Sequence, residues 1–118
     1  KSEMIKDTLN SFLVKQKKEN KLVCAYGAAA KGSTLLNYAG IDDNLIKYVF
    51  DAAPSKQNKF LPGSHIPILH PNEIKKIKPD VLIILPWNIK DEIITQNSYV
   101  KKWGCEFVTF IPKLEIIK

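Results

Sequence analysis

The sequence contains no arginine. All 18 of its basic residues are lysines, set against 12 acidic residues, and the formal net charge is +6. Arginine supplies the planar fork with which proteins read guanine and grip phosphate in a bidentate manner. The lysines are also scattered, with small clusters at 15–18, 75–78 and 101–102 on expected solvated helix faces, where they favour solubility. The composition therefore argues against a nucleic-acid partner.

Cysteine is scarce as well. Cys24 lies inside one apolar stretch and Cys105 opens another, and two cysteines are too few for a disulfide framework or a thiolate metal site. We interpret both as small buried hydrophobic residues in a reducing cytoplasm. Neither His65 nor His70 has a carboxylate or second histidine nearby at metal-ligand spacing, so both are predicted to be structural.

Long apolar runs are missing too. None reaches the roughly 18–20 residues of a membrane span, and no signal peptide is recognisable, so we expect a cytoplasmic protein with no membrane partner. The chain has 118 residues and opens on Lys in a helical pattern, which suggests one domain cut from a longer polypeptide. We expect residues 1–20 to form a linker or packing helix and residues 21–118 to form the domain.

Apolar segments of strand length alternate with segments of helical periodicity along the chain. Expected strands lie at 22–26, 46–50, 66–69, 81–85 and 106–110, and expected helices at 3–19, 31–39, 71–77 and 89–102. Residues 114–117 fit either a final edge strand or a tail. Strands that alternate with helices indicate parallel βαβ units. We therefore predict an α/β, Rossmann-like three-layer sandwich with a parallel five-stranded sheet in the order 3-2-1-4-5.

The segment 23–34, VCAYGAAAKGST, runs from the first strand through a small-residue turn into a helix. Free amides and the dipole at a helix N-terminus favour an anion there. The segment is not a Walker A loop, because Lys31 precedes the second glycine and Ser33 stands where the lysine should be, and Ala29 replaces the middle glycine of GxGxxG. A turn that needs small residues only for packing explains the segment equally well.

Three turns are expected to meet at the edge of this sheet. In the order 3-2-1-4-5, strands 1 and 4 are neighbours, so the turn after Gly27 lies beside the turn that carries Trp87 and Asn88. Asp51 follows the second strand, 24 positions after Gly27, where dinucleotide-binding folds place the acid that holds a ribose diol. Asp51 could equally just begin the loop, and Lys31 fits either an anion partner or a solvated charge.

The other candidates also have structural explanations. Asn88 fits a helix N-cap with Asp91 as its capping partner, and Trp87 fits a packing aromatic residue. No pairing of a nucleophile with a base is visible in the sequence.

Taken together, these segments resemble one family, the C-terminal domain of the SAM-dependent C-methyltransferases that act on nucleotide-linked deoxysugars. The resemblance covers nearly the whole chain and departs from the family pattern at Asn58, where glycine is expected. It is carried by YGAAAKGSTLLNYAGI at 26–41, DAAPSKQNKFLPGSHIPI at 51–68, PD at 79–80, LPWN at 85–88, EI at 92–93 and FIP at 110–112.

The resemblance implies a three-part enzyme whose N-terminal region binds zinc, whose central domain binds SAM, and whose C-terminal Rossmann-like domain closes over the sugar nucleotide. Only the last part matches this chain, so we expect no cofactor and no catalytic residue in it. Its partners would be the nucleotide sugar and the SAM-binding domain of the same polypeptide. The predicted substrate-binding residues are Tyr26, Gly27, Ala28, Lys31, Gly32, Ser33, Asp51, Lys56, Trp87 and Asn88.

The sequence also fits two other functions. One is an independent dinucleotide-binding Rossmann domain, favoured by the strand, turn and helix with Asp51 and opposed by the missing middle glycine. The other is an interaction scaffold that binds no small molecule. Within the leading interpretation, the sheet edge could contact either the ligand or the neighbouring domain.

Overall fold

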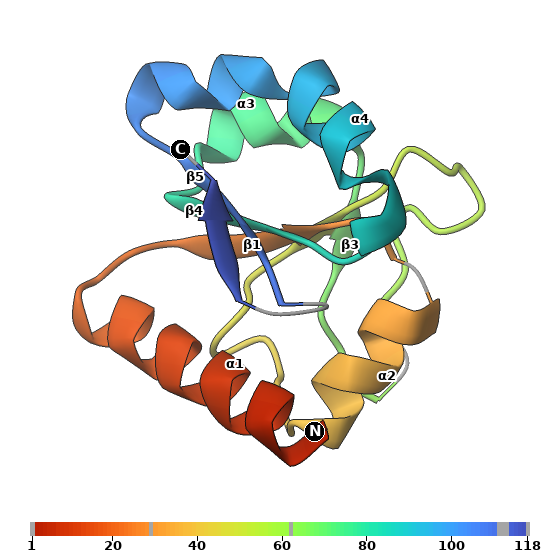
Figure 1. Cartoon of the computed structure of the whole chain (residues 1–118). Coiled ribbons are helices and arrows are strands. Elements are labelled where there is room, and N and C mark those ends of the chain that lie inside the picture. Colours follow the sequence, from red (N-terminus) through yellow and green to blue (C-terminus); the bar gives the residue numbers. More distant parts are fainter. Residues whose placement is uncertain (1, 29, 62, 111–113, 118) are drawn as a thin grey trace.

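A computed structural model describes residues 2–28, 30–61, 63–110 and 114–117. A six-stranded sheet in the order β3-β2-β1-β4-β5-β6 runs through its centre (Figure 1). Five strands are parallel in the expected order, and β6 is an added strand that pairs antiparallel with β5. The strands are β1 Val23–Tyr26, β2 Val49–Phe50, β3 Ile68–Leu69, β4 Val81–Ile84, β5 Glu106–Thr109 and β6 Glu115–Ile117.

Helices cover both faces of the sheet and complete the predicted three-layer sandwich (Figure 1). On one face lie α1 (Ser2–Lys18) and α2 (Ala30–Tyr38). The opposite face carries α3 (Ile74–Ile77), α4 (Lys90–Gln96) and the 3-10 helix η3 (Ser98–Trp103). Two further 3-10 helices, η1 (Pro71–Glu73) and η2 (Trp87–Ile89), lead into α3 and α4.

The core consists of two apolar clusters, one on each face of the sheet. Along β1, Val23 and Ala25 pack toward α1 and α2, while Cys24 packs toward the opposite layer. All four residues of β4 are buried, as expected for a parallel strand covered on both faces. Leu9 and Leu13 of α1 are fully buried in the first cluster, so this helix is packed against the sheet.

Several elements differ in extent from the sequence expectation. The third strand is confined to Ile68–Leu69, and the helix expected over 71–77 is divided into η1 and α3. The single helix expected over 89–102 is divided into α4 and η3 at Asn97, whose buried side chain donates a hydrogen bond to the carbonyl of Ile93 (2.8 Å). Side-chain bonding of this kind competes with regular helical geometry. The second strand is also shorter than expected: β2 comprises only Val49–Phe50. Hydrogen bonding to β1 starts slightly earlier, since the amide of Lys47 donates to the carbonyl of Val23 (3.0 Å).

Neither cysteine forms a disulfide. Cys24 and Cys105 are buried free thiols, on opposite sides of β4 in the strand order. Burial raises the pKa of each thiol from the usual 9.0 to about 12. The stability that this shift provides is present below pH 9 and is lost as the pH rises from 9 toward 12, because only the unfolded state then ionises readily.

These thiols are expected to resist alkylation while the domain is folded. At pH 8 the native protein should react with iodoacetamide at least about 100-fold more slowly than the urea-unfolded protein, since the thiolate is the nucleophile and both groups are buried. Mass spectrometry of timed reactions measures the two rates. Native labelling as fast as unfolded labelling would contradict the assigned environments.

None of the helices in the described ranges combines the length and apolar character needed to cross a lipid bilayer. The same residues contain no cluster of three or more side chains suited to hold a metal ion.

His70 has a structural role, as predicted: its Nδ1 accepts a hydrogen bond from the amide of Asn72 (3.0 Å) and caps η1.

Candidate functional site

The turns after β1 and β4 touch at the carboxyl edge of the sheet. Gly27 adopts φ +89°, and a Cβ built on it would lie 2.5 Å from Cδ and 2.7 Å from Cγ of Pro86. Its amide donates to the carbonyl of Phe50 at the end of β2 (2.7 Å). Only glycine satisfies both the left-handed conformation and the close approach, so the glycine of the turn predicted from the sequence is required here by geometry.

Asp51 joins the turn after β1 to the loop after β2. Its Oδ2 accepts a hydrogen bond from the amide of Ala28 (2.7 Å), and its Oδ1 accepts one from the amide of Ala53 (2.8 Å). Lys56 completes the connection by donating from Nζ to the carbonyl of Ala28 (2.9 Å). Each oxygen of the Asp51 carboxylate therefore already accepts a hydrogen bond from the main chain.

A cleft of about 330 Å³ opens where these turns face α4. The turns after β1 and β2 form the floor of the cleft, and α4 with the segment before it forms the wall. The lining residues are Tyr26, Gly27, Ala28, Asp51, Ala52, Lys56, Pro86, Ile89, Glu92, Ile93 and Gln96. One of these, Tyr26, ends β1; five come from the segments after β1 and β2, and five from the segment after β4.

The wall residues were missed by the sequence analysis. Ile89, Glu92, Ile93 and Gln96 follow the i, i+3, i+4, i+7 spacing of a single helical face. That spacing was readable in the sequence and would have identified them once the helix after β4 was placed beside the turn after β1.

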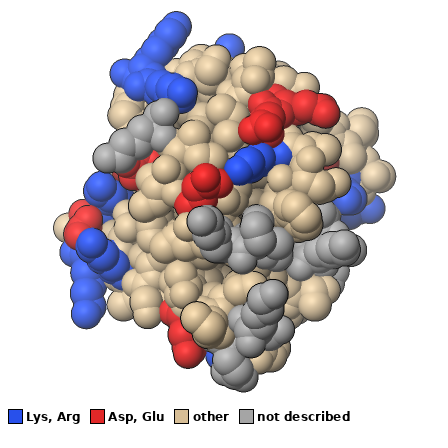
Figure 2. Space-filling view, viewed as in Figure 1, with Lys and Arg blue, Asp and Glu red and all other residues tan. Residues whose placement is uncertain are grey.

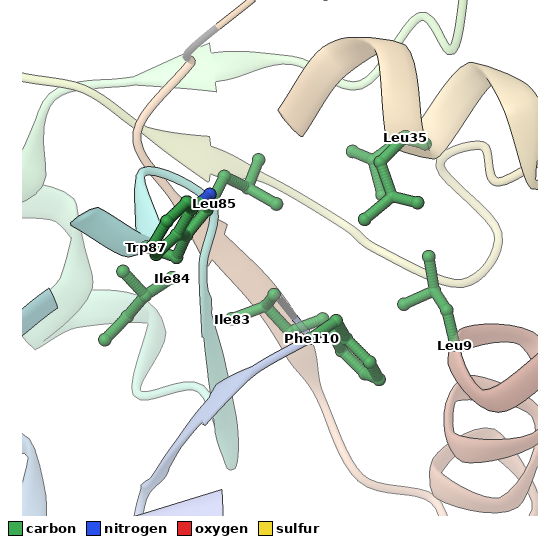
Figure 3. Close-up of a pocket in the computed structure, with 8 residues that line it drawn as sticks. Leu9, Leu35, Ile83, Ile84, Leu85, Trp87 and Phe110 are labelled. Carbon is green, nitrogen blue, oxygen red and sulfur yellow. The ribbon is translucent and has the colours of Figure 1, made fainter. Parts of the chain in front are cut away.

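Trp87 does not line this cleft. It borders a separate apolar pocket of about 10 Å³, on the side of the sheet that α1 and α2 cover. Figure 3 shows Trp87 and Leu85 on one side of that pocket, with Leu35 of α2 and Leu9 of α1 on the other. A space of this size holds at most about one water molecule. Its contacts at this pocket fit the packing interpretation of Trp87, although 38% of the residue remains exposed.

The N-cap expected at Asn88 is wrong. Asn88 is an exposed residue inside η2, and the residue before α4 is Ile89, which makes no side-chain capping bond. The reason is that the 3-10 turn runs directly into the helix, so the amide of Ile89 donates to the carbonyl of Pro86 (3.0 Å) and that of Lys90 to Trp87. Backbone carbonyls thus satisfy the amides that a cap would serve.

Three predicted site residues, Lys31, Gly32 and Ser33, lie in the first turns of α2. Their side chains fall outside what the structure describes.

Asn58, where the family pattern expects glycine, adopts φ +62°. Asparagine tolerates this left-handed conformation better than most residues, so the loop keeps the backbone shape that glycine would permit.

These features define a Rossmann-like α/β domain with a small, mixed-polarity cleft at the carboxyl ends of its strands. Residues 1–112 match the family described as "C-methyltransferase C-terminal domain", and the chain belongs to that family. It is 37% identical over 99 residues to "C-methyltransferase NovU" of Streptomyces niveus, an alignment that covers 84% of this chain and 24% of that protein. The chain therefore spans about a quarter of the length of this relative.

A solved structure confirms the fold class. The chain resembles the crystal structure of UDP-D-quinovosamine 4-dehydrogenase from Vibrio fischeri with a TM-score of 0.59 at 18% identity, covering 83% of this chain and 93% of that one.

Proposed function

We propose that this domain of a C-methyltransferase binds the sugar part of a nucleotide-linked deoxysugar in the cleft between the turns after β1 and β2 and the wall of α4. The substrate class is the one that the sequence resemblance implies. The observation that carries the proposal is the set of side chains facing the cleft: a lysine, a glutamate, a glutamine and a tyrosine beside Ile89 and Ile93.

This mixture suits a neutral ring that bears hydroxyl groups. A hydroxyl both donates and accepts hydrogen bonds, so it can use an ammonium donor such as Lys56, a carboxylate acceptor such as Glu92, and an amide such as Gln96. The apolar side chains of α4 offer a surface for the C–H face of a sugar. A volume of about 330 Å³ lies at the small end of ligand pockets, roughly 300–1,000 Å³, and fits one ring better than a dinucleotide.

The arrangement gives less support to an independent dinucleotide-binding domain. In such a domain the corresponding carboxylate binds the ribose diol, whereas each oxygen of Asp51 accepts a main-chain hydrogen bond and together they link two loops. We propose that Asp51 is a positioning residue, and that the sheet edge around the cleft faces the SAM-binding domain of the same polypeptide.

Substitution of Glu92 is expected to weaken binding of a nucleotide sugar. In NMR titrations of the chain with dTDP-glucose as probe, saturable shift changes are expected at the amides of Gly27, Ala52 and Gln96. Glu92→Ala should raise the Kd about 10-fold by removing one hydrogen bond to a charged group. Asp91→Ala is the matched control, because Asp91 is an exposed residue of the same helix that does not line the cleft.

Lys56→Ala tests the loop after β2 in the same way, with Lys59→Ala as its control because Lys59 is exposed and does not line the cleft. SAM added alone should cause no saturable change, because we propose that this cofactor binds in the central domain. The assignment of the cleft would be refuted if millimolar dTDP-glucose caused no shift changes. It would also be refuted if the changes were confined to residues on the face of the sheet that α1 and α2 cover.

A further inference from the structure

The last strand of the sheet, β6, is its edge strand within the part of the chain that the structure describes. β6 pairs with β5 and ends the strand order, so among the described residues no strand lies beyond it. Unpaired edges are templates for pairing with another chain, and proteins usually protect them with charge. The charge of Glu115 is instead engaged by Lys90 of the same chain (Nζ to Oε1, 2.8 Å), while Leu114 and Ile116 are 36% and 46% exposed.

A groove of about 660 Å³ runs beside this strand, between β6 and α1. It has twice the volume of the cleft described above. Phe12, Leu114 and Ile116 give it an apolar side, and polar residues of α1 form its rim. The charges that line the groove are of both signs, so no field of a single sign would repel a second copy; they are Asp7, Glu19, Glu106, Lys15 and Lys21. The space-filling view, drawn from the direction of Figure 1, shows both acidic and basic residues on the face in view (Figure 2).

The exposed stripe of α1 along this groove is complementary to itself. Asp7, Ser11 and Lys15 are spaced four residues apart, line the groove and are exposed, so they lie on one helical face. The two opposite charges stand at equal distances from Ser11. If two such helices cross antiparallel at Ser11, Asp7 of each copy meets Lys15 of the other.

We propose that this face binds a second copy of the chain. β6 would pair antiparallel with its counterpart, and α1 would cross its counterpart at Ser11. A two-fold axis perpendicular to the sheet would make both pairs antiparallel, because it reverses every direction in the sheet plane and keeps both α1 helices on one face. Such an interface is isologous and closed, and gives a dimer rather than a filament. It leaves the clefts beside β1 and β2 uncovered, so it does not depend on the proposed function.

The test is a charge swap across the two-fold axis, read by sedimentation equilibrium of the 118-residue chain. At roughly 100 µM, above the Kd of most specific interfaces, the chain should be a dimer. Lys15→Asp should raise the dimer Kd about 100-fold, because it sets like charges against each other at two symmetry-related positions. Adding Asp7→Lys to that variant should restore the Kd to within a few-fold of the original.

Two controls make the result specific. Lys17→Asp changes the net charge equally on an exposed residue of α1 outside the groove, and should leave the Kd unchanged. Ile116→Lys places a charge on the edge strand and should weaken dimerisation. A monomer at this concentration, as expected if another protein or domain covers the face, would overturn the proposal. So would equal effects of Lys15→Asp and Lys17→Asp, or a failure of the double variant to recover.

Discussion

Replacing Gly27 by alanine is expected to lower the free energy of unfolding by about 3–4 kcal/mol and the Tm by roughly 10–15 °C. Two costs combine. The backbone at φ +89° is unfavourable for any residue with a Cβ, and that Cβ would lie 2.5 Å from Cδ of Pro86. A proline ring cannot rotate away, so the turns after β1 and β4 must separate. Urea unfolding followed by circular dichroism measures the loss.

Gly40→Ala separates the two costs. Gly40 has φ +71°, similar to Gly27, but a Cβ there would meet no atom within 4 Å. Its substitution should therefore cost only the backbone term, about 1 kcal/mol. If the two variants lost equal stability, the contact between Gly27 and Pro86 would not be the cause, and the close approach of the two turns would be refuted.

Asp51→Ala is the second large effect, with an expected loss of about 2–4 kcal/mol in unfolding free energy. The substitution removes the acceptor of two main-chain amides, and an unsatisfied buried amide costs about 1–3 kcal/mol. Ala28, which carries one of them, is only 8% exposed. Asp51→Asn keeps one side-chain oxygen as an acceptor and should lose about half as much. Native-state hydrogen exchange should locate the change at the amides of Ala28 and Ala53.

The control for Asp51 is Asp42→Ala. Asp42 also accepts a hydrogen bond from an amide, that of Asn44 (3.0 Å), but at an exposed turn. Water can replace this bond, so the expected change is within about 0.5 kcal/mol. A loss at position 51 no larger than at position 42 would show that the carboxylate does not hold the two loops together.

The strand order could be predicted because it depends on features that the sequence displays directly. β4 is a continuous apolar run of Val, Leu and Ile, and such runs between helical segments indicate parallel strands buried on both faces. The right-handed crossover rule then restricts the order. The antiparallel β6 left a weaker signal, since three exposed or half-exposed residues do not distinguish an edge strand from a tail.

The geometry of the candidate site was predicted in part for a related reason. The meeting of Gly27 with Pro86 follows from topology alone, because adjacent parallel strands end at the same edge. The side on which Trp87 lies depends on a few backbone angles in η2. The division of the helix at Asn97 depends on one buried amide that forms a hydrogen bond to its own helix. Neither the position of Trp87 nor the division of the helix at Asn97 produces a periodic pattern in the sequence, so neither could be predicted from it.

The hydrogen bonds around Ala28 also bear on the motion of this edge. Both main-chain polar groups of Ala28 are held by one loop, its amide by Asp51 and its carbonyl by Lys56. The loop after β2 therefore cannot lift without releasing the turn after β1, and the two segments form a single cooperative opening unit. Their amides should exchange with a shared opening free energy, and a ligand seated on either segment would slow exchange in both.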